Sequence, residues 1–287
     1  MNIEMAYLLG MICGNGQIQR TSTNTTLSID IPHKKLQTDE IHDVKLYVKA
    51  SISDIRAIVE PLVGAGLDFI QNKSSTVLSF NKPNSDYLIR EINRFTGNAT
   101  SHHDINIHED IFNCTLDERR QFIKGFADVT GYIRRSNVYF KKFEHRVYFE
   151  IPHNWQMVID ICNLLKSTDI PVQTIDWAHP NMRDGNLTAY NDGKPSFWKK
   201  EHQIKVWANE FIPIGFGIIH KQQALEMFSE ELIAGYKALN KDTDKKTHKY
   251  YWDSKRKSNK VKPPHPGEED DFIPDTIRGK HFNSWSE

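Results

Sequence analysis

The chain of 287 residues has few cysteines, no net charge and no long run of apolar residues. Its three cysteines, Cys13, Cys114 and Cys162, are odd in number and far apart, which argues against a disulfide framework or a metal knuckle. The formal net charge is zero, so any binding of nucleic acid requires local clusters of Lys and Arg. No apolar run approaches the ~20 residues of a membrane span, and the amino terminus lacks a signal-peptide pattern. We therefore expect a soluble intracellular protein, cytoplasmic or organellar, without a membrane partner.

What the sequence does contain is an internal repeat. Residues 8–18 and residues 123–133 share a pattern of glycines, offset by 125 − 10 = 115 positions. The matched glycines are Gly10 with Gly125 and Gly16 with Gly131. An acid followed by Ile-Pro-His then occurs downstream of each copy, at residues 30–33 and 150–153. Two copies of one structural unit are the simplest interpretation, and the functional site is expected where the copies meet.

Periodicity, capping patterns and turn residues predict an alternation of helices and strands. Helices are expected over 4–14, 51–63, 83–95, 115–128, 155–165 and 221–239. Strands are expected over 25–31, 43–50, 67–71, 76–80, 138–143, 146–151, 172–177 and 202–207. Each half then runs helix, two strands, helix, two strands, helix, which is an α+β pattern.

These patterns divide the chain into four parts. They are a first repeat over 1–100, a linker over 101–114, a second repeat over 115–239 and a carboxy-terminal extension over 240–287. The extension mixes basic residues, including Lys255, Arg256 and Lys257, with aromatic ones, a composition that suits contact with a phosphate backbone. A flexible, solvated tail explains the same composition equally well.

The two glycine motifs resemble the signature of the LAGLIDADG homing endonucleases in their single-chain, two-repeat form. The signature is a helix with two glycines and two acids, followed by a strand. The first copy matches it through Leu8, Gly10 and Gly16, and the second through Gly125, Asp128 and Gly131. The order of elements after each motif agrees with that family over roughly residues 1–239.

This resemblance implies a particular fold and activity. The fold would be two pseudo-symmetric αββαββα repeats with saddle-shaped antiparallel sheets, in which Gly10 and Gly125 let the two motif helices pack closely. The protein would act as a monomer on double-stranded DNA, laying strands in the major groove. Its reaction would be a double-strand break that depends on Mg²⁺ or Mn²⁺.

The chain departs from the family at the positions that matter most. The second acid of each motif, which binds the metal in the family, is replaced by Asn15 and Thr130, while Asp128 stands at the first acidic position. The candidate metal ligands, Asn15, Asp128 and Thr130, therefore lack the concentrated negative charge that Mg²⁺ requires. Three explanations remain open: an engineered Asp-to-Asn change, a protein that binds DNA without cutting, or chemistry carried by neighbouring side chains.

Five residues are candidates to assist such chemistry. Two are histidines at strand ends, and the other three lie near the last helix of a half, one in the first half and two in the second. His33 and His153 end the two Ile-Pro-His tripeptides, and a neutral imidazole binds metal or takes a proton near pH 7. In the family a basic residue precedes the last helix of each half, a place held by Lys82 in the first copy and by His220 and Lys221 in the second. A hydrogen-bonded histidine at a strand end is the alternative for His33 and His153.

Charged residues on the expected strands are candidate DNA contacts. They are Asp30, Glu150, Arg134, Arg135, Lys141, Arg146 and Lys205, together with Lys255, Arg256 and Lys257 of the extension. The two acids are suited to accept a hydrogen bond from a cytosine amino group, and the basic residues suit phosphates. Ordinary exposure of charged side chains explains them equally well.

We therefore expect a DNA endonuclease of the homing or restriction-like kind. A non-cleaving transcription regulator of the same fold is the main alternative, and an enzyme acting on a small molecule is a third. His102, His103 and His108 fall in the linker, where a polar loop is a better interpretation than a metal site.

Overall fold

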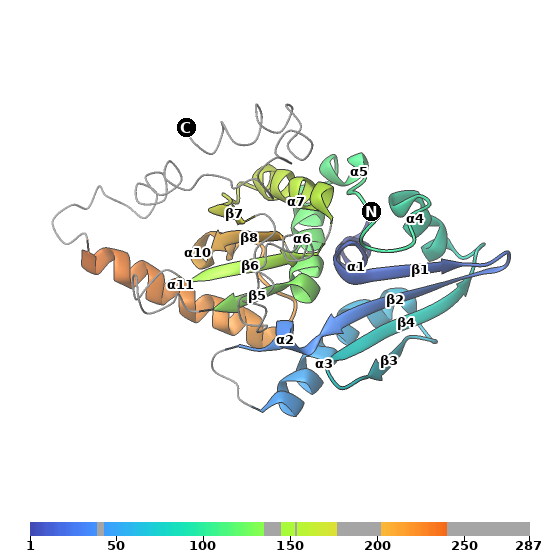
Figure 1. Ribbon diagram of the computed structural model, residues 1–287, viewed down its shortest axis with the longest axis horizontal. Coiled ribbons are helices and arrows are strands. Elements are labelled where there is room, and N and C mark those ends of the chain that lie inside the picture. The colour runs from blue at the N-terminus through green and yellow to red at the C-terminus, as the bar shows by residue number, and fades with distance from the viewer. Residues whose placement is uncertain (39–42, 135–144, 153, 177–201, 240–287) are drawn as a thin grey trace, which may run out of the picture. The chain divides into compact units, whose positions relative to one another are not determined.

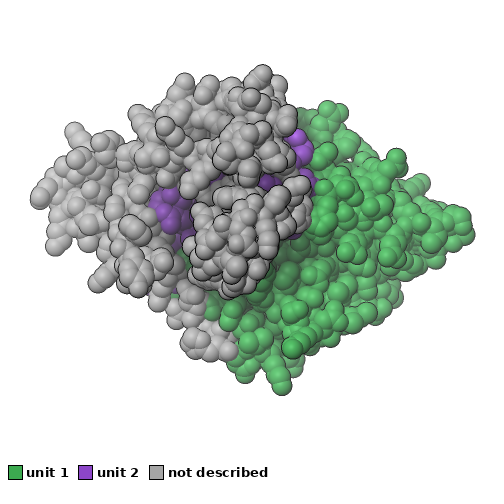
Figure 2. Space-filling model, in the orientation of Figure 1, with its two compact units in different colours: residues 1–134, 212–227 green, residues 135–211, 228–287 purple. Residues whose placement is uncertain are grey.

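A computed structural model of the chain describes residues 1–38, 43–134, 145–152, 154–176 and 202–239. The chain divides into two compact units, coloured in Figure 2. The first comprises residues 1–134 and 212–227, and the second comprises residues 135–211 and 228–287. Within the described ranges, no helix has the length and apolar character that crossing a membrane requires.

The first unit begins with a buried helix and a four-stranded antiparallel sheet (Figure 1). Its elements are α1 (Ile3–Asn15), β1 (Gly16–Arg20), β2 (Asn24–Pro32), α2 (His33–Leu36), α3 (Val44–Val63), β3 (Asp68–Gln71), β4 (Ser75–Pro83) and α4 (Tyr87–Thr96). The strand order is β1-β2-β4-β3, which places the two long strands in the centre. One face of the sheet carries the buried residues Ile18, Leu27 and Phe80, and side chains alternate to the opposite face.

The second motif helix, α6 (Leu116–Thr130), also lies in the first unit. It follows the short α5 (Glu109–Phe112) and leads directly into β5 (Gly131–Arg134). Thr115 caps its amino end and forms a capping box with Glu118, as the sequence predicted. We call α1 and α6 the motif helices.

The second unit holds three antiparallel strands in the order β6-β8-β7. Its elements are β6 (Arg146–Ile151), α7 (Trp155–Ser167), β7 (Thr174–Asp176), β8 (His202–Trp207) and α10 (Ala208–Phe211). The last helix, α11 (Ile219–Leu239), belongs to the first unit up to Met227 and to the second unit from Phe228. The strand order repeats that of β2-β4-β3 in the first half.

The structure confirms the α+β class and the repeated order of helices and strands. Each half runs αββαββα, and short helices are inserted in both. The strands β1 and β5, which follow the motif helices without a break, were not located by the sequence patterns. The expected strand over 138–143 lies outside the described residues.

Two expected elements are wrong, each because a capping aspartate decides the local structure. Residues 43–50 alternate like a strand but begin α3, where Asp43 accepts hydrogen bonds from the backbone N–H groups of Lys45 and Leu46. The helix expected from Pro83 begins instead at Tyr87, because Asp86 caps it while Pro83 still belongs to β4.

Candidate functional site at the ends of the motif helices

The two motif helices, α1 and α6, lie side by side (Figure 1), and they are in direct backbone contact at their glycines. A Cβ atom on Gly10 would lie 2.8 Å from the backbone nitrogen of Phe126 and 2.9 Å from the carbonyl carbon of Phe122. A Cβ atom on Gly125 would lie 2.8 Å from the carbonyl carbon of Tyr7. Tyr7 and Phe122 are themselves related by the 115-residue offset, so the contacts are reciprocal. This confirms the prediction that Gly10 and Gly125 permit close packing.

The carboxyl ends of both helices close in the same way. The N–H groups of Gly16 and Gly131 donate to the carbonyl oxygens of Ile12 and Ala127, which are again 115 positions apart. A helix of this kind leaves its last carbonyl groups without partners in the helix. The site is built around those carbonyl groups of α6.

Asn15 and Thr130 both turn their polar groups toward the backbone of α6. The amide nitrogen Nδ2 of Asn15 donates to the carbonyl oxygen of Val129 at 3.1 Å, which joins the end of α1 to the end of α6. The Thr130 hydroxyl is buried and donates to the carbonyl oxygen of Phe126 at 2.7 Å. The two positions that hold acids in the family therefore act here as hydrogen-bond donors to a helix.

Asp128 is fully buried on α6 and is held by groups from two other segments. Its Oδ2 atom accepts hydrogen bonds from the Tyr7 hydroxyl at 2.7 Å and from the N–H of Gly217 at 2.8 Å. Its Oδ1 atom has no hydrogen-bond partner and lies 3.9 Å from the Nζ atom of Lys221. Asp128 thus links α1, α6 and the start of α11.

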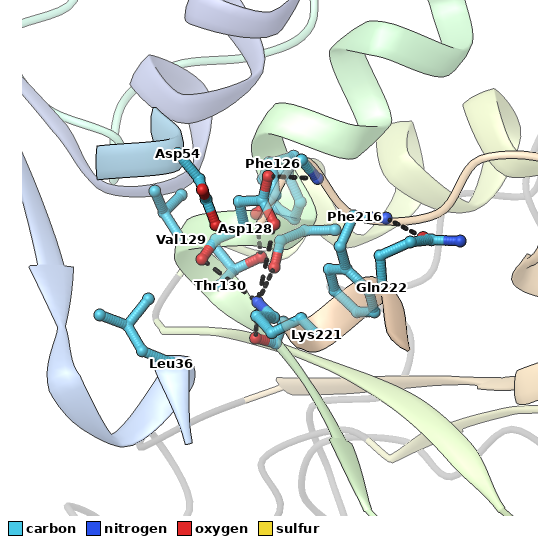
Figure 3. A network of polar contacts seen from close by, with 12 residues as sticks. Leu36, Asp54, Phe126, Asp128, Val129, Thr130, Phe216, Lys221 and Gln222 are labelled. Atoms are coloured by element: carbon cyan, nitrogen blue, oxygen red, sulfur yellow. Dashed lines mark hydrogen bonds and ion pairs between the residues drawn. The ribbon is translucent and has the colours of Figure 1, made fainter. Parts of the chain in front are cut away.

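Lys221 reaches from α11 to the end of α6, as Figure 3 shows. Its Nζ atom donates to the carbonyl oxygens of Ala127 at 3.1 Å, Asp128 at 3.3 Å and Gly131 at 2.9 Å. The side chain is fully buried, and Nζ also lies 4.3 Å from the centre of the Phe216 ring. A cation at a helix carboxyl terminus interacts favourably with the helix dipole.

Burial dominates the electrostatics of this cluster. It lowers the pKa of Lys221 to about 8, against the opposing effect of the Asp128 carboxylate, so the lysine is an ammonium ion at neutral pH. Burial raises the pKa of Asp128, while Lys221 and the Tyr7 hydroxyl lower it. Burial and the same carboxylate raise the pKa of Tyr7 well above its ordinary value, which keeps its hydroxyl a donor.

The histidine candidates are engaged elsewhere in the first unit. The His33 ring is buried, and its Nε2 atom lies 3.0 Å from the hydroxyl of Thr76 on β4. The His220 ring places Nε2 2.7 Å from the carbonyl oxygen of Leu36. Burial lowers the pKa of both imidazoles. His153 lies outside the described residues.

Lys82 is not brought to the helix ends. It pairs with Thr25 on β2, whereas Gly16 pairs with Ile29, four residues further along that strand. At ~3.3 Å per residue the two positions are about 13 Å apart along the sheet. Lys82 instead forms an ion pair with Asp86 at the start of α4.

The candidate DNA contacts that the structure describes lie on strands, and their charges are engaged in several ways. The Arg134 guanidinium lies over the Tyr132 ring and that of Arg146 over the Trp207 ring, both at 4.5 Å. Lys205 lies 5.7 Å from the centre of the Tyr148 ring, and Glu150 accepts a hydrogen bond from Gln203. Asp30 is half-buried on β2. Arg135, Lys141, Lys255, Arg256 and Lys257 lie outside the described residues.

A face that the sequence patterns did not single out lies on the first sheet. Strand register places uncharged polar side chains in rows across β1, β2 and β4 on the side opposite the core. One row is Gln17, Ser28 and Ser79, and the next is Gln19, Thr26 and Asn81. These six residues, which we call the polar face, are exposed or half-buried. The alternation of polar and apolar residues along β2 was the signal for it.

The residues present do not fit a divalent metal ion. The Asp128 carboxylate is buried against a lysine ammonium, and Thr130 and Asn15 donate hydrogen bonds instead of offering negative charge. Mg²⁺ is usually held by one or two accessible carboxylates, together with water and phosphate oxygens. Among the described residues, no group of three or more His, Cys, Asp or Glu side chains is placed to hold a metal ion.

Tyr7 and Gly217 are the site residues that sequence reasoning missed. Both bind Asp128 from segments 121 and 89 positions away along the chain, a distance at which residue patterns give no signal. For Tyr7 a partial signal existed, because it sits one helical turn before Gly10 on the same face.

No family model matches the sequence, and no curated protein does either. Among solved structures, the chain is similar to the homing endonuclease I-DmoI in complex with DNA and Mn, with 15% identity and a TM-score of 0.39 over 77% of this chain and 97% of that chain. It is similar to the K262A mutant of I-SmaMI, with 12% identity and a TM-score of 0.38 over 84% and 93% of the two chains. It is also similar to full-length DUF199/WhiA from Thermatoga maritima, with 10% identity and a TM-score of 0.40 over 80% and 59%.

Proposed function

We propose that this chain is a duplex-DNA-binding protein of the LAGLIDADG type that acts as a monomer and reads base edges with the polar face of its first sheet. The polar face is the observation that carries the proposal. The partition into repeats over 1–100 and 115–239, a linker over 101–114 and an extension over 240–287 belongs to the same proposal.

The polar face has the chemistry of base recognition. Amide and hydroxyl side chains both donate and accept hydrogen bonds, as the edges of bases in the major groove do. Asn81 donates to the Thr26 hydroxyl at 2.6 Å and accepts from Asn24 at 3.1 Å, so part of the face is held in position before any ligand arrives. The six side chains of the polar face are uncharged, and the first row continues onto β3 with the exposed carboxylate of Asp68 beside Ser79.

Phosphate contacts fall to the basic residues of the second half. Arg134, Arg146 and Lys205 each lie over an aromatic ring, which limits their freedom before DNA binds. Arg135, Lys141, Lys255, Arg256 and Lys257 are proposed for the same role from their sequence positions alone. A protein that neutralises phosphates releases counterions, so its affinity falls steeply with salt.

At the motif-helix ends, the geometry supports binding more than cleavage. Hydrolysis by metal-bound water requires a metal, and Asp128, the carboxylate at this end of α6, is fully buried against Lys221 and already accepts a hydrogen bond from Tyr7. Metal-dependent double-strand cleavage, whether homing or restriction-like, is the second candidate function. Asn15 favours it, because its side chain has the shape of aspartate and lies where α1 meets α6.

Selection of binders from a library of random duplexes tests the proposal. We expect enrichment of a defined sequence in the presence of EDTA, and replacement of Gln17 or Ser28 by Ala should relax the preference at individual base pairs. Arg146→Gln, as the matched control, should weaken binding to all sequences alike and reduce the salt slope by about 1. Absence of salt-dependent binding to any duplex would refute the proposal and favour an enzyme acting on a small molecule.

The second candidate is tested by cleavage of the selected duplex in Mg²⁺ or Mn²⁺. Cutting by the natural chain would establish the endonuclease and place its chemistry outside the cluster of Asp128 and Lys221. Cutting only by Asn15→Asp combined with Thr130→Asp would show that two lost carboxylates account for the inactivity. If neither the natural protein nor the double variant breaks a DNA strand, the result supports DNA binding without cleavage.

A further inference from the structure

The carboxyl end of α6 is a cation site that the protein fills with its own side chain. Ammonium has three N–H donors, and Lys221 directs all three at backbone carbonyl oxygens, those of Ala127, Asp128 and Gly131. No N–H of Lys221 is left for a ligand. The three distances, from 2.9 to 3.3 Å, lie within or just beyond the usual range of N–H···O hydrogen bonds.

Two further carbonyl groups near this end also accept hydrogen bonds from side chains. Asn15 donates to the carbonyl oxygen of Val129, and Thr130 donates to that of Phe126. The carbonyl oxygens of Phe126 to Val129 and of Gly131 thus all accept from side-chain donors of the protein. A metal ion placed there would have to displace donors from the carbonyl oxygens that it needs as ligands.

The charges of the buried side chains also argue against a metal ion at the end of α6. Lys221 and Asp128 are both fully buried, and they are one positive and one negative group 3.9 Å apart. Lys35 already adds a positive charge that lowers the pKa of Lys221, so a further cation would be repelled in this buried site. The carboxylate oxygen Oδ2 is already bound to Tyr7 and Gly217. The Oδ1 atom, which no hydrogen bond satisfies, faces the ammonium.

We propose that the ammonium group of Lys221 is the resident cation of the motif-helix end, and that the groups around it do not fit a divalent metal ion. The fold of the first unit then depends on Lys221 and needs no metal. This inference concerns the helix end itself and stands or falls independently of DNA binding.

Thermal unfolding of the full chain, followed by circular dichroism, tests the proposal. The natural chain should unfold at the same temperature in EDTA, in excess Mg²⁺ and in excess Mn²⁺. Lys221→Met should lower the midpoint by about 10 °C, since it strands the buried Asp128 carboxylate and frees three carbonyl oxygens. The control Lys45→Met, at an exposed position near the start of α3, should change it by less than about 2 °C.

The double variant Lys221→Met with Asp128→Asn separates loss of the ion pair from loss of packing. It should recover part of the lost midpoint, since no unpaired charge remains. Stabilisation of the natural chain by Mg²⁺ or Mn²⁺ that Asp128→Asn abolishes would overturn the proposal. So would a Lys221→Met variant as stable as the Lys45→Met control. If Lys221→Met fails to fold, the metal titrations of the natural chain and of Asp128→Asn decide the matter.

Discussion

Replacing Gly10 by Ala gives the sharpest prediction about the packing of the motif helices. On an isolated or exposed helix this change stabilises by about 1 kcal/mol, because Gly is a poor helix former. Here the new methyl group would overlap the carbonyl oxygen of Phe122 and lie 2.8 Å from the backbone nitrogen of Phe126. Ordinary contacts of a Cβ atom begin near 3.4 Å, so the helices must separate by more than half an ångström.

The neighbouring atoms are helix backbone, which does not yield as a flexible side chain does. The cost is therefore at the upper end of the range for overpacking, about 3 kcal/mol. Subtracting the gain in helix propensity leaves a net loss of about 2 kcal/mol, or a fall of about 4–8 °C in the unfolding midpoint. Urea unfolding followed by circular dichroism measures the change in free energy.

Gly125→Ala provides the matched variant, because its methyl group would meet the backbone of Tyr7 in the same way. The two changes should not be additive: once the helices have separated for one methyl group, the second costs less. A Gly10→Ala variant that is more stable than the natural chain would refute the close contact between α1 and α6. Alanine stabilises a helix at this position only if no neighbouring backbone meets its methyl group.

Three further predictions concern the polar groups of the first unit. Tyr7→Phe removes a donor from the buried Asp128 carboxylate and should lower the free energy of unfolding by about 1–3 kcal/mol, measured in urea, whereas an unchanged value would mean that Asp128 has another donor. Asn15→Asp places a carboxylate against the carbonyl oxygen of Val129 and should also destabilise by about 1–3 kcal/mol; a more stable variant would contradict the hydrogen bond. Burial lowers the pKa of His33, so the unfolded chain takes up a proton first as the pH falls below about 6.5, and stability should decline there. His33→Gln should reduce that decline by at most about 1.4 kcal/mol per pH unit, and an identical pH profile would exclude His33 as its source.

The sequence predicted the fold best where its signals were local or repeated. The 115-residue offset located both motif helices, the family resemblance implied the glycine contact between them, and the capping box at Thr115 located the start of α6. Errors arose where two local signals competed. The alternation over 43–50 looked like a strand, but Asp43 caps a helix and leaves Leu46 exposed.

The candidate site was predicted only in part. Asn15, Asp128, Thr130 and Lys221 gather at the end of α6, where the motif comparison and the family resemblance had made them candidates. Their roles were not visible, because the bond from Lys221 to Gly131 spans 90 residues and depends on burial. Placing Lys82 required the strand register, which residue types alone do not fix.

Binding and integrity of one selected duplex, compared in EDTA and in Mg²⁺, test the central claim most directly. That claim is that the protein's own donors close the motif-helix ends while the polar face reads DNA. Fluorescence anisotropy should give the same affinity in both buffers at matched ionic strength, and a denaturing gel should show both strands intact. Affinity that appears only with Mg²⁺, lost when Asp128 is changed to Asn, together with two broken strands, would contradict the account.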